Sequence, residues 1–341
     1  MSFSPDVVVV GAGAWGTALA CVLAANERPV ALWARDPAHR QAMREAGENA
    51  RYLPGLPLPA SIRVWDDLAQ LPDGCHLAVL ATPCQTTREI ATWLRRVAPG
   101  LRALVCTAKG LELGSHRLIH QVVGEVFGAD FPLGLLSGPT FAREVAEGRP
   151  AAVTLAARDP ALGRALLARF HTPRFRPYLT DDLSGVALGG SVKNVLAIAA
   201  GVADGLALGA NSRAALITRG LAEMARLGLA LGARQETFMG LSGLGDLVLT
   251  STDDQSRNRR FGLALGRGAS LNEAQAGVGL VEGATTALSM EAIAAEHGLV
   301  MPISAEVARI VRGETGPAAA VAALMAREPA SEFIPPQANP A

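Results

Sequence analysis

The sequence predicts an α/β N-terminal half, built on a doubly wound and mainly parallel sheet, followed by an all-α C-terminal half. Three observations support this fold class. Short apolar runs alternate with helical patterns through the first half, as in a parallel sheet with crossover helices. These runs are apolar throughout, as expected for strands buried on both faces. Beyond about residue 182 strand signals nearly vanish, and helical patterns interrupted by glycines take their place.

The chain length supports a division into domains, because 341 residues exceed one ordinary core. We predict an α/β domain over residues 1–182 and a helical domain over residues 183–327. The segment 328–341 contains four prolines and is predicted to be a disordered tail.

Seven apolar runs are expected to form strands. The first is a run of valines that stops at Gly11, and the others are likewise short and rich in β-branched or apolar residues. In order they span residues 6–10, 30–34, 77–80, 103–106, 133–136, 153–156 and 175–178.

Helical patterns connect these runs and then fill the second half. Between the strands, helices are expected at residues 15–25, 85–97, 116–127 and 161–170, among others. In the second half they are expected at residues 183–205, 212–232, 255–266, 281–298 and 303–312.

The composition excludes several partners. Basic and acidic residues balance at 31 each, so no overall field attracts nucleic acid or an anionic membrane. The four cysteines lack metal-ligand spacing, so we expect no metal.

Reduced, mostly buried thiols and the lack of a secretory signal indicate a cytoplasmic protein. The segment 186–203 is apolar, but Lys193 near its centre would lie in hydrocarbon, so we expect a buried helix and no membrane span.

A glycine motif, GAGAWG at residues 11–16, follows the first strand and begins a helix. Gly11 permits a tight turn, Gly13 lets a pyrophosphate approach the backbone, and Gly16 allows the helix to pack closely on the strand. The helix N-terminus then offers free N–H groups to phosphates. Because strand, loop and helix occur together, the motif predicts a Rossmann-like dinucleotide site rather than a structural turn.

The second strand indicates which dinucleotide is bound. Arg35 occupies its tip and Asp36 follows. An arginine fork suits the 2′-phosphate of NADPH, whereas an acidic residue would accept hydrogen bonds from the free ribose of NADH. We expect NADPH, with NADH as the alternative.

Lys193 is the best candidate for acid–base chemistry, because it is the one charged residue in an apolar segment and burial lowers a lysine's pKa. The structural alternative is a lysine that reaches the surface from a buried helix.

Lys109 follows the strand at 103–106, where ligands of open α/β sheets collect. Asp246 lies in an otherwise apolar turn. The run SRNRR at 256–260 could cradle a phosphate.

Several motifs together carry a specific resemblance. SGPTFA at 137–142, GGSVKNV at 189–195, NSRAALITRG at 211–220, the segment 240–246 and the run 256–260 resemble the bacterial-type NAD(P)-dependent glycerol-3-phosphate dehydrogenase family. The similarity extends over residues 5–325, in order and with the family's spacing. It implies interconversion of dihydroxyacetone phosphate and sn-glycerol 3-phosphate, which supplies phospholipid synthesis.

The resemblance also implies roles for individual residues. Lys193 matches the catalytic lysine. Substrate contacts are implied for Lys109, Gly138, Thr140, Lys193, Asp246, Ser256, Arg257 and Asn258. Cofactor contacts are implied for Gly11, Gly13, Ala14, Trp15, Gly16, Arg35, Lys109, Ala142, Arg257, Leu280 and Glu282. Ala14 stands where many relatives have a serine, so one side-chain contact to the pyrophosphate is expected to be missing.

Other interpretations stay open. Asp246 could cap a helix, Thr140 could be the N-cap of a helix at 141–147, and Arg259 and Arg260 are expected to form a solvated face.

The runner-up function is another two-domain dehydrogenase, acting on a hydroxy acid or sugar phosphate. A regulator that binds NADP without turnover is disfavoured because Lys109, Lys193 and Asp246 are all present. The only protein partner considered is a second copy, in a homodimer.

Overall fold

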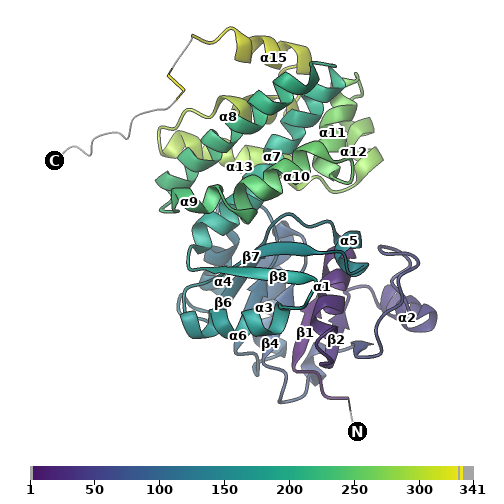
Figure 1. The fold of residues 1–341 in the computed structure, drawn as a ribbon. Coiled ribbons are helices and arrows are strands. Elements are labelled where there is room, and N and C mark those ends of the chain that lie inside the picture. Colours follow the sequence, from purple (N-terminus) through teal and green to yellow (C-terminus); the bar gives the residue numbers. More distant parts are fainter. Residues whose placement is uncertain (1–2, 329–330, 333–341) are drawn as a thin grey trace, which may run out of the picture.

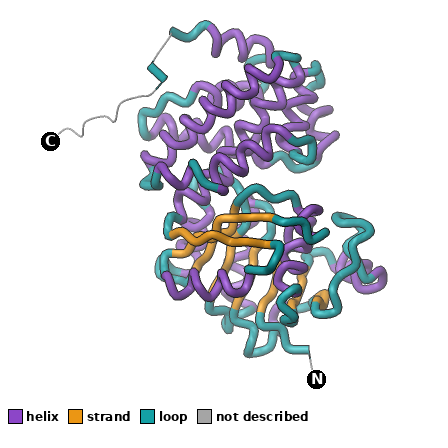
Figure 2. The backbone as a smooth tube through the Cα atoms, in the orientation of Figure 1, coloured by secondary structure: helices purple, strands orange, loops and turns teal. Residues whose placement is uncertain are grey.

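The two halves of the chain differ in architecture: the first is α/β and the second is all helical. The computed structural model describes residues 3–328 and 331–332. Figure 1 shows the strands and helices α1 to α6 gathered in one half and helices α7 to α15 in the other, and Figure 2 shows the strands confined to the first of these. An α/β part followed by an all-α part is the fold class that the sequence predicts.

The sheet has eight strands within the described residues, in the order β3-β2-β1-β4-β5-β6-β7-β8. β6 and β7 pair antiparallel, and the other neighbours pair parallel. The strands are β1 (Val7–Val10), β2 (Val30–Trp33), β3 (Ile62–Val64), β4 (Leu77–Leu80), β5 (Ala103–Cys106), β6 (Leu133–Ser137), β7 (Ala151–Ala157) and β8 (Phe175–Thr180).

The seven strands expected from the apolar runs are confirmed, and β3 was not predicted. β3 has three residues, and Arg63 at its centre is exposed. β3 lies at the edge of the sheet, and of its three residues only Ile62 is buried. Residues 62–64 therefore do not form a continuous apolar run.

Both faces of the sheet are covered, which explains why the strands are apolar throughout. Val7 and Val9 of β1 face one hydrophobic cluster, which includes residues of α1 (Ala14–Ala24) and α6 (Pro160–Phe170). Val8 and Val10 face the other, which includes residues of α3 (Thr87–Val97) and α4 (Ile119–Phe127). The remaining helices of this half are α2 (Pro37–Ala46) and α5 (Ala142–Ala146), with short 3-10 turns at Leu68–Gln70 and Cys84–Thr86.

The helical half is organised around α7 (Leu183–Gly205), which is buried over nearly its whole length. Among the described residues α7 is long and apolar enough to cross a membrane, but its apolar stretch is wholly buried inside the protein. The other elements are α8 (Gly209–Ala230), α9 (Gln235–Phe238), a π-helical turn at Leu241–Gly245, α10 (Asp246–Thr252), α11 (Arg257–Gly266), α12 (Leu271–Val278), α13 (Glu282–Glu296), α14 (Pro302–Val311) and α15 (Pro317–Met325).

α7 and α11 pack in closest contact through glycines. A Cβ on Gly201 of α7 would lie 2.1 Å from the carbonyl oxygen of Arg259, and one on Gly262 of α11 would lie 2.0 Å from that of Ile198. Backbone therefore meets backbone at this crossing. The contact fixes Lys193 of α7 relative to Arg257, which begins α11.

Several helix expectations are corrected. The helix expected at 116–127 begins only at Ile119, because His116 has a positive φ and Leu118 pairs with Leu111 in a β-bridge. Helices α2, α9, α10, α12 and α15 were not predicted; most are short. The predicted tail, 328–341, lies outside the described residues apart from 328, 331 and 332, and the Glu332 carbonyl accepts a hydrogen bond from Arg219.

Candidate active site

The site lies where the carboxyl ends of the central strands face the helical half. β1 ends at Val10 before the glycine loop, and β5 ends at Cys106 three residues before Lys109. β6 ends at Ser137, next to Gly138. Parallel strands deliver these segments to one edge of the sheet. α7 and α10 bring Lys193 and Asp246 to the same place.

One carboxylate binds both lysines. Lys193 Nζ donates to Asp246 Oδ1 at 2.9 Å, and Lys109 Nζ donates to Asp246 Oδ2 at 2.6 Å. Asp246 is 1% exposed and the two lysine side chains are 10% and 17% exposed. The expectation that Lys193 lies in a buried helix is confirmed, and its alternative as a surface-reaching lysine is wrong.

Each ammonium group in this cluster has a hydrogen-bond donor to spare. Lys193 also donates to Thr250 Oγ1 at 2.7 Å, and Lys109 also donates to the Gly138 carbonyl at 3.1 Å. An ammonium group carries three N–H donors, so one remains on each lysine. The cluster therefore presents two charged donors on either side of a shared counter-ion.

The charges in the cluster change one another's ionisation. Burial lowers the pKa of Lys193 to about 8, although the Asp246 carboxylate acts against this. Burial alone would raise the pKa of the Asp246 carboxyl, but the Lys109 and Lys193 ammonium groups hold it below its ordinary value. Asp246 is thus a permanent anion beside a lysine that can gain or lose a proton near neutral pH.

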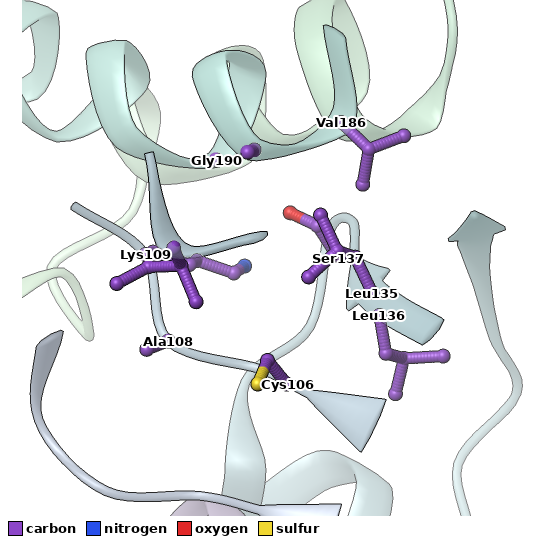
Figure 3. Close-up of a pocket in the computed structure, with 10 residues that line it drawn as sticks. Cys106, Ala108, Lys109, Leu135, Leu136, Ser137, Val186 and Gly190 are labelled. Atoms are coloured by element: carbon purple, nitrogen blue, oxygen red, sulfur yellow. The ribbon is translucent and has the colours of Figure 1, made fainter. Parts of the chain in front are cut away.

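Two glycines that precede Lys193 allow close packing of α7: Gly190 against this edge of the sheet, and Gly189 against the turn at Leu241–Gly245. A Cβ on Gly189 would lie 2.4 Å from the Ser242 carbonyl oxygen, and one on Gly190 would lie 2.7 Å from Ser137 Oγ. Figure 3 shows Lys109 and Ser137 beneath the helix that carries Gly190. A cavity of about 10 Å³ between them has room for roughly one water molecule.

The glycine loop has the geometry that a pyrophosphate needs. α1 begins at Ala14 after Gly13, and no side chain caps its N-terminus. A Cβ on Gly13 would meet nothing within 4 Å, whereas one on Gly16 would lie 1.8 Å from the Gly11 carbonyl oxygen. The indole Nε1 of Trp15 is buried and has no hydrogen-bond partner among the described residues. Open space, free N–H groups and an unpaired donor all fit a bound dinucleotide.

At the tip of β2, Arg35 is exposed and Asp36 caps the helix that follows. The Asp36 side chain is the N-cap of α2, and its Oδ1 accepts from the Ala38 backbone N–H at 3.0 Å. The expected acidic partner for a free ribose is therefore bound to its own helix.

The residues expected to bind phosphate lie at the N-terminus of α11, in three different environments. Arg257 is exposed as the first residue of this helix. Ser256 is the N-cap, accepting from the Arg259 backbone N–H at 3.1 Å. Asn258 is already engaged, donating to Asn194 Oδ1 and accepting from the Gly283 backbone N–H, each at 3.0 Å.

Three of the alternative interpretations are wrong. Arg259 does not lie on the expected solvated face, because its buried guanidinium pairs with Asp204 at 2.6 Å and with Asp254, whereas Arg260 is exposed as expected. Thr140 is not a helix N-cap; α5 begins at Ala142, and Thr140 Oγ1 donates to the Gly138 carbonyl at 3.2 Å. Asp246 is the first residue of α10, and its side chain binds lysines rather than capping the helix.

Leu280 and Glu282, expected to contact the cofactor, lie in different environments at the start of α13. Leu280 is 45% exposed. The Glu282 carboxylate accepts from the Cys84 backbone N–H at 3.1 Å. Burial raises the pKa of the Glu282 carboxyl, while the charges of Arg257, Lys193 and Lys109 oppose the shift. Glu282 therefore lies within the electrostatic reach of the lysine cluster and of Arg257.

Thr250 is the site residue that sequence reasoning missed. It lies four residues after Asp246 on α10, so both side chains lie on one face of the helix. Asp246 was expected in a turn and no helix was expected after it, so this spacing carried no signal. Among the described residues, no group of three or more His, Cys, Asp or Glu side chains is placed to hold a metal ion.

A dinucleotide cradle and a buried lysine that meet at the carboxyl edge of a doubly wound sheet are the arrangement of a nicotinamide-dependent dehydrogenase. Family models narrow the class. The model described as NAD-dependent glycerol-3-phosphate dehydrogenase N-terminus matches residues 6–163, and the corresponding C-terminus model matches residues 182–322. The chain belongs to this family.

Individual relatives agree over nearly the whole chain. "Glycerol-3-phosphate dehydrogenase [NAD(P)+]" of Thioalkalivibrio sulfidiphilus is 52% identical over 332 residues, 96% of this chain and 99% of the relative. The protein of that name from Dechloromonas aromatica is 51% identical over 329 residues, 96% and 99% of the two chains. The crystal structure of glycerol-3-phosphate dehydrogenase from Coxiella burnetii matches with a TM-score of 0.90 at 44% identity, covering 96% of this chain and all of that one.

Proposed function

We propose that the protein interconverts dihydroxyacetone phosphate and sn-glycerol 3-phosphate, with Lys193 as the acid–base residue, and so supplies phospholipid synthesis. The observation that carries this proposal is the pair of lysines on Asp246, buried at the edge of the sheet beside the dinucleotide cradle. Family membership supports the choice of reaction.

The cofactor is held by residues from both halves. Its pyrophosphate fits Gly11, Gly13, Ala14, Trp15 and Gly16, and Lys109, Ala142, Arg257, Leu280 and Glu282 complete the expected contacts. When bound, the nicotinamide supplies or accepts the hydride at the substrate carbon.

Lys193 serves the substrate oxygen. In the reducing direction its ammonium group gives a proton to the oxygen as the carbonyl becomes an alcohol; in the oxidising direction the neutral amine takes that proton back. A lysine with a pKa of about 8 can do both near neutral pH. The spare N–H of Lys109 stabilises negative charge on the same oxygen or on a neighbouring hydroxyl.

The substrate phosphate is anchored by Arg257, with Ser256, Thr140 and the backbone at Gly138 around it. Arg257 lies at a helix N-terminus, where both the guanidinium fork and the helix dipole favour an anion. The two lysines and Arg257 outnumber the nearby carboxylates of Asp246 and Glu282, so the site suits an anionic phosphate ester.

The test mixes the purified protein with dihydroxyacetone phosphate and either reduced cofactor and follows the loss of absorbance. We expect turnover with the phosphate ester and very poor turnover with dihydroxyacetone or with a hydroxy-acid precursor such as pyruvate. The absence of turnover with both cofactors would contradict the proposal, and faster reduction of a keto acid would favour a different dehydrogenase.

NADPH is the proposed cofactor, with NADH a poorer one. Arg35 is exposed at the tip of β2, and Asp36 is occupied as a helix cap. Arg35→Asp should weaken NADPH binding selectively, by on the order of 2 kcal/mol for a charge-assisted contact. Steady-state KM values for both cofactors measure this. An equal change for each cofactor would remove Arg35 from the specificity role.

We also propose that the protein acts in the cytoplasm as a homodimer. All four cysteines are unpaired, which suits a reducing compartment. Leu229 and Met239 are 53% and 61% exposed and offer apolar surface to a second copy. Sedimentation velocity should give twice the mass of one chain; a monomer at micromolar concentration would contradict the dimer.

A further inference from the structure

The acidic residue at the tip of β2 is neutralised from two sides. Asp36 Oδ1 accepts from the Ala38 backbone N–H at 3.0 Å, and Asp36 Oδ2 lies 3.7 Å from Arg51 Nη1. Asp36 is thus held by its helix and faces a cation on its other oxygen. A carboxylate at this position would otherwise repel a 2′-phosphate.

Arg51 belongs to a loop that is fixed to the glycine loop. Asn49, which is fully buried, donates to the Ala12 carbonyl at 3.0 Å and to Thr17 Oγ1 at 2.7 Å. The backbone N–H groups of Tyr52 and Leu53 donate to the Asn49 carbonyl at 3.1 and 2.8 Å. Arg51 is therefore held at a defined place relative to the phosphate-binding turn.

Two aromatic rings support the position of Arg51. Its guanidinium carbon lies 5.3 Å from the centre of the Tyr52 ring. That ring meets His39 edge-on at 5.4 Å, and a ring nitrogen of His39 lies 3.4 Å from the Ala12 carbonyl oxygen. The side chain is 60% exposed, so its charge remains available to a ligand.

A second aspartate near the end of β2, Asp66, is also paired with arginines. Arg40 donates to the Ala34 carbonyl at 2.6 Å and to the Arg35 carbonyl at 3.3 Å. Asp66 is paired with Arg40 and with Arg44. Asp36 and Asp66 thus each have an arginine partner: Arg51 for Asp36, and Arg40 with Arg44 for Asp66.

We propose that Arg51 is a second specificity residue for the 2′-phosphate of NADPH: it neutralises Asp36 and adds a cation beside Arg35. This inference rests on the proposed use of NADPH. Arg35 alone would face an adjacent uncompensated carboxylate. With Arg51 across that carboxylate, the tip of β2 attracts a dianion.

The experiment measures binding rather than turnover. Isothermal titration of the full chain with adenosine 2′,5′-bisphosphate and with adenosine 5′-monophosphate isolates the 2′-phosphate from the rest of the cofactor. Arg51→Gln should weaken the bisphosphate about fivefold, the upper range for exposed charge pairs, and leave the monophosphate within about twofold. Asp36→Asn keeps the helix cap but removes the charge, so adding it to Arg51→Gln should recover most of the loss.

Arg28→Gln is the matched control. Arg28 pairs with Asp6 at 3.1 Å before the start of β2, at the opposite end of that strand, and is 52% exposed. The substitution changes the net charge equally and should leave both ligands unaffected. Equal weakening of both ligands by Arg51→Gln, the same effect from Arg28→Gln, or no recovery by Asp36→Asn would overturn the inference. The proposed preference for NADPH is tested by the wild type alone: it would be contradicted if the wild type bound the bisphosphate no better than the monophosphate. The role of Arg51 is tested by the ratio of the two affinities, which Arg51→Gln should lower.

Discussion

Asp246 determines the behaviour of both lysines at the residue scale. Without it, two ammonium groups would share a buried space, and burial and mutual repulsion would both favour the neutral amines. The carboxylate keeps the cluster charged, while burial keeps the pKa of Lys193 close to neutrality. A group that must both give and take a proton needs this balance.

This balance predicts the pH dependence of the reaction. If the ammonium form of Lys193 is the acid, as we propose, kcat for reduction should fall as the pH rises through about 8. The rate of the reverse oxidation should rise through the same range, since it needs the neutral amine. Steady-state rates at saturating substrate between pH 6 and pH 10 (~0.5-unit steps suffice to resolve one proton) measure both limbs.

Asp246→Asn provides the control for that profile. It removes the charge that favours the ammonium form, so the alkaline limb for reduction should move to lower pH, with circular dichroism confirming that the variant is folded. A flat wild-type profile across this range, or a limb that ignores Asp246→Asn, would contradict the assignment of Lys193.

Arg257 is expected to act on the phosphate alone. Arg257→Ala should lose several kcal/mol of kcat/KM for dihydroxyacetone phosphate, about the strength of a bidentate charge-assisted contact. Arg257→Lys should be intermediate because it keeps the charge but loses the fork. Dihydroxyacetone, a poor substrate, should hardly be affected by either change. Equal impairment of both substrates by Arg257→Ala would show that the residue acts through fold or cofactor instead.

Sequence reasoning at this scale was right about charge and wrong about partners. A lone lysine in an apolar segment indicated burial, and Lys193 is buried. Nothing in the spacing showed that Lys109, 137 residues before Asp246, would share its carboxylate. Arg259 was expected in solvent because arginines are mostly exposed, and nothing in the spacing pointed to its partner Asp204, 55 residues away. Long-range pairs of this kind depend on how helices pack, which periodicity does not report.

At the scale of elements, the crossing of α7 and α11 holds the site together. The two helices meet through glycines, so that Lys193 on one and Arg257 on the other are held at a fixed separation. Apolar runs and helical patterns located most elements, since each of those elements buries a long apolar stretch. β3 and α10 escaped because a three-residue edge strand and a seven-residue helix bury too few side chains to leave a pattern.

The crossing predicts a large effect of one methyl group. In Gly262→Ala the new Cβ would lie 2.0 Å from the Ile198 carbonyl oxygen, so the helices must separate. The free energy of unfolding should fall by about 1–3 kcal/mol or more. Urea unfolding should be followed by far-ultraviolet circular dichroism, to which the helices of the second half contribute. Tryptophan fluorescence would not report on that half, because the four tryptophans all lie in the first half.

Gly277→Ala is the matched control for this prediction. Gly277 is also helical, in α12, and a Cβ there would meet nothing within 4 Å. The same substitution should be neutral or slightly stabilising. Comparable losses at positions 262 and 277 would show that glycine flexibility, rather than close packing, explains the first result.

At the scale of the whole molecule, the site exists only where the two halves meet. Lys109 follows a strand of the sheet, whereas Lys193 and Asp246 come from helices of the other half. The Lys109–Asp246 pair therefore crosses between the halves, and the dinucleotide cradle opens beside it. Neither half by itself carries the whole cluster of Lys109, Lys193 and Asp246.

Lys193→Met tests the central claim most directly. Methionine approximates the lysine stem, so packing should survive while the proton donor disappears. We predict that turnover of dihydroxyacetone phosphate falls by about 10²–10⁴-fold or more, the range typical of acid–base groups. NADPH should still bind within about twofold of wild type. A folded Lys193→Met variant that retains activity within about threefold of wild type, well short of that range, would contradict the account and make Lys193 a structural residue.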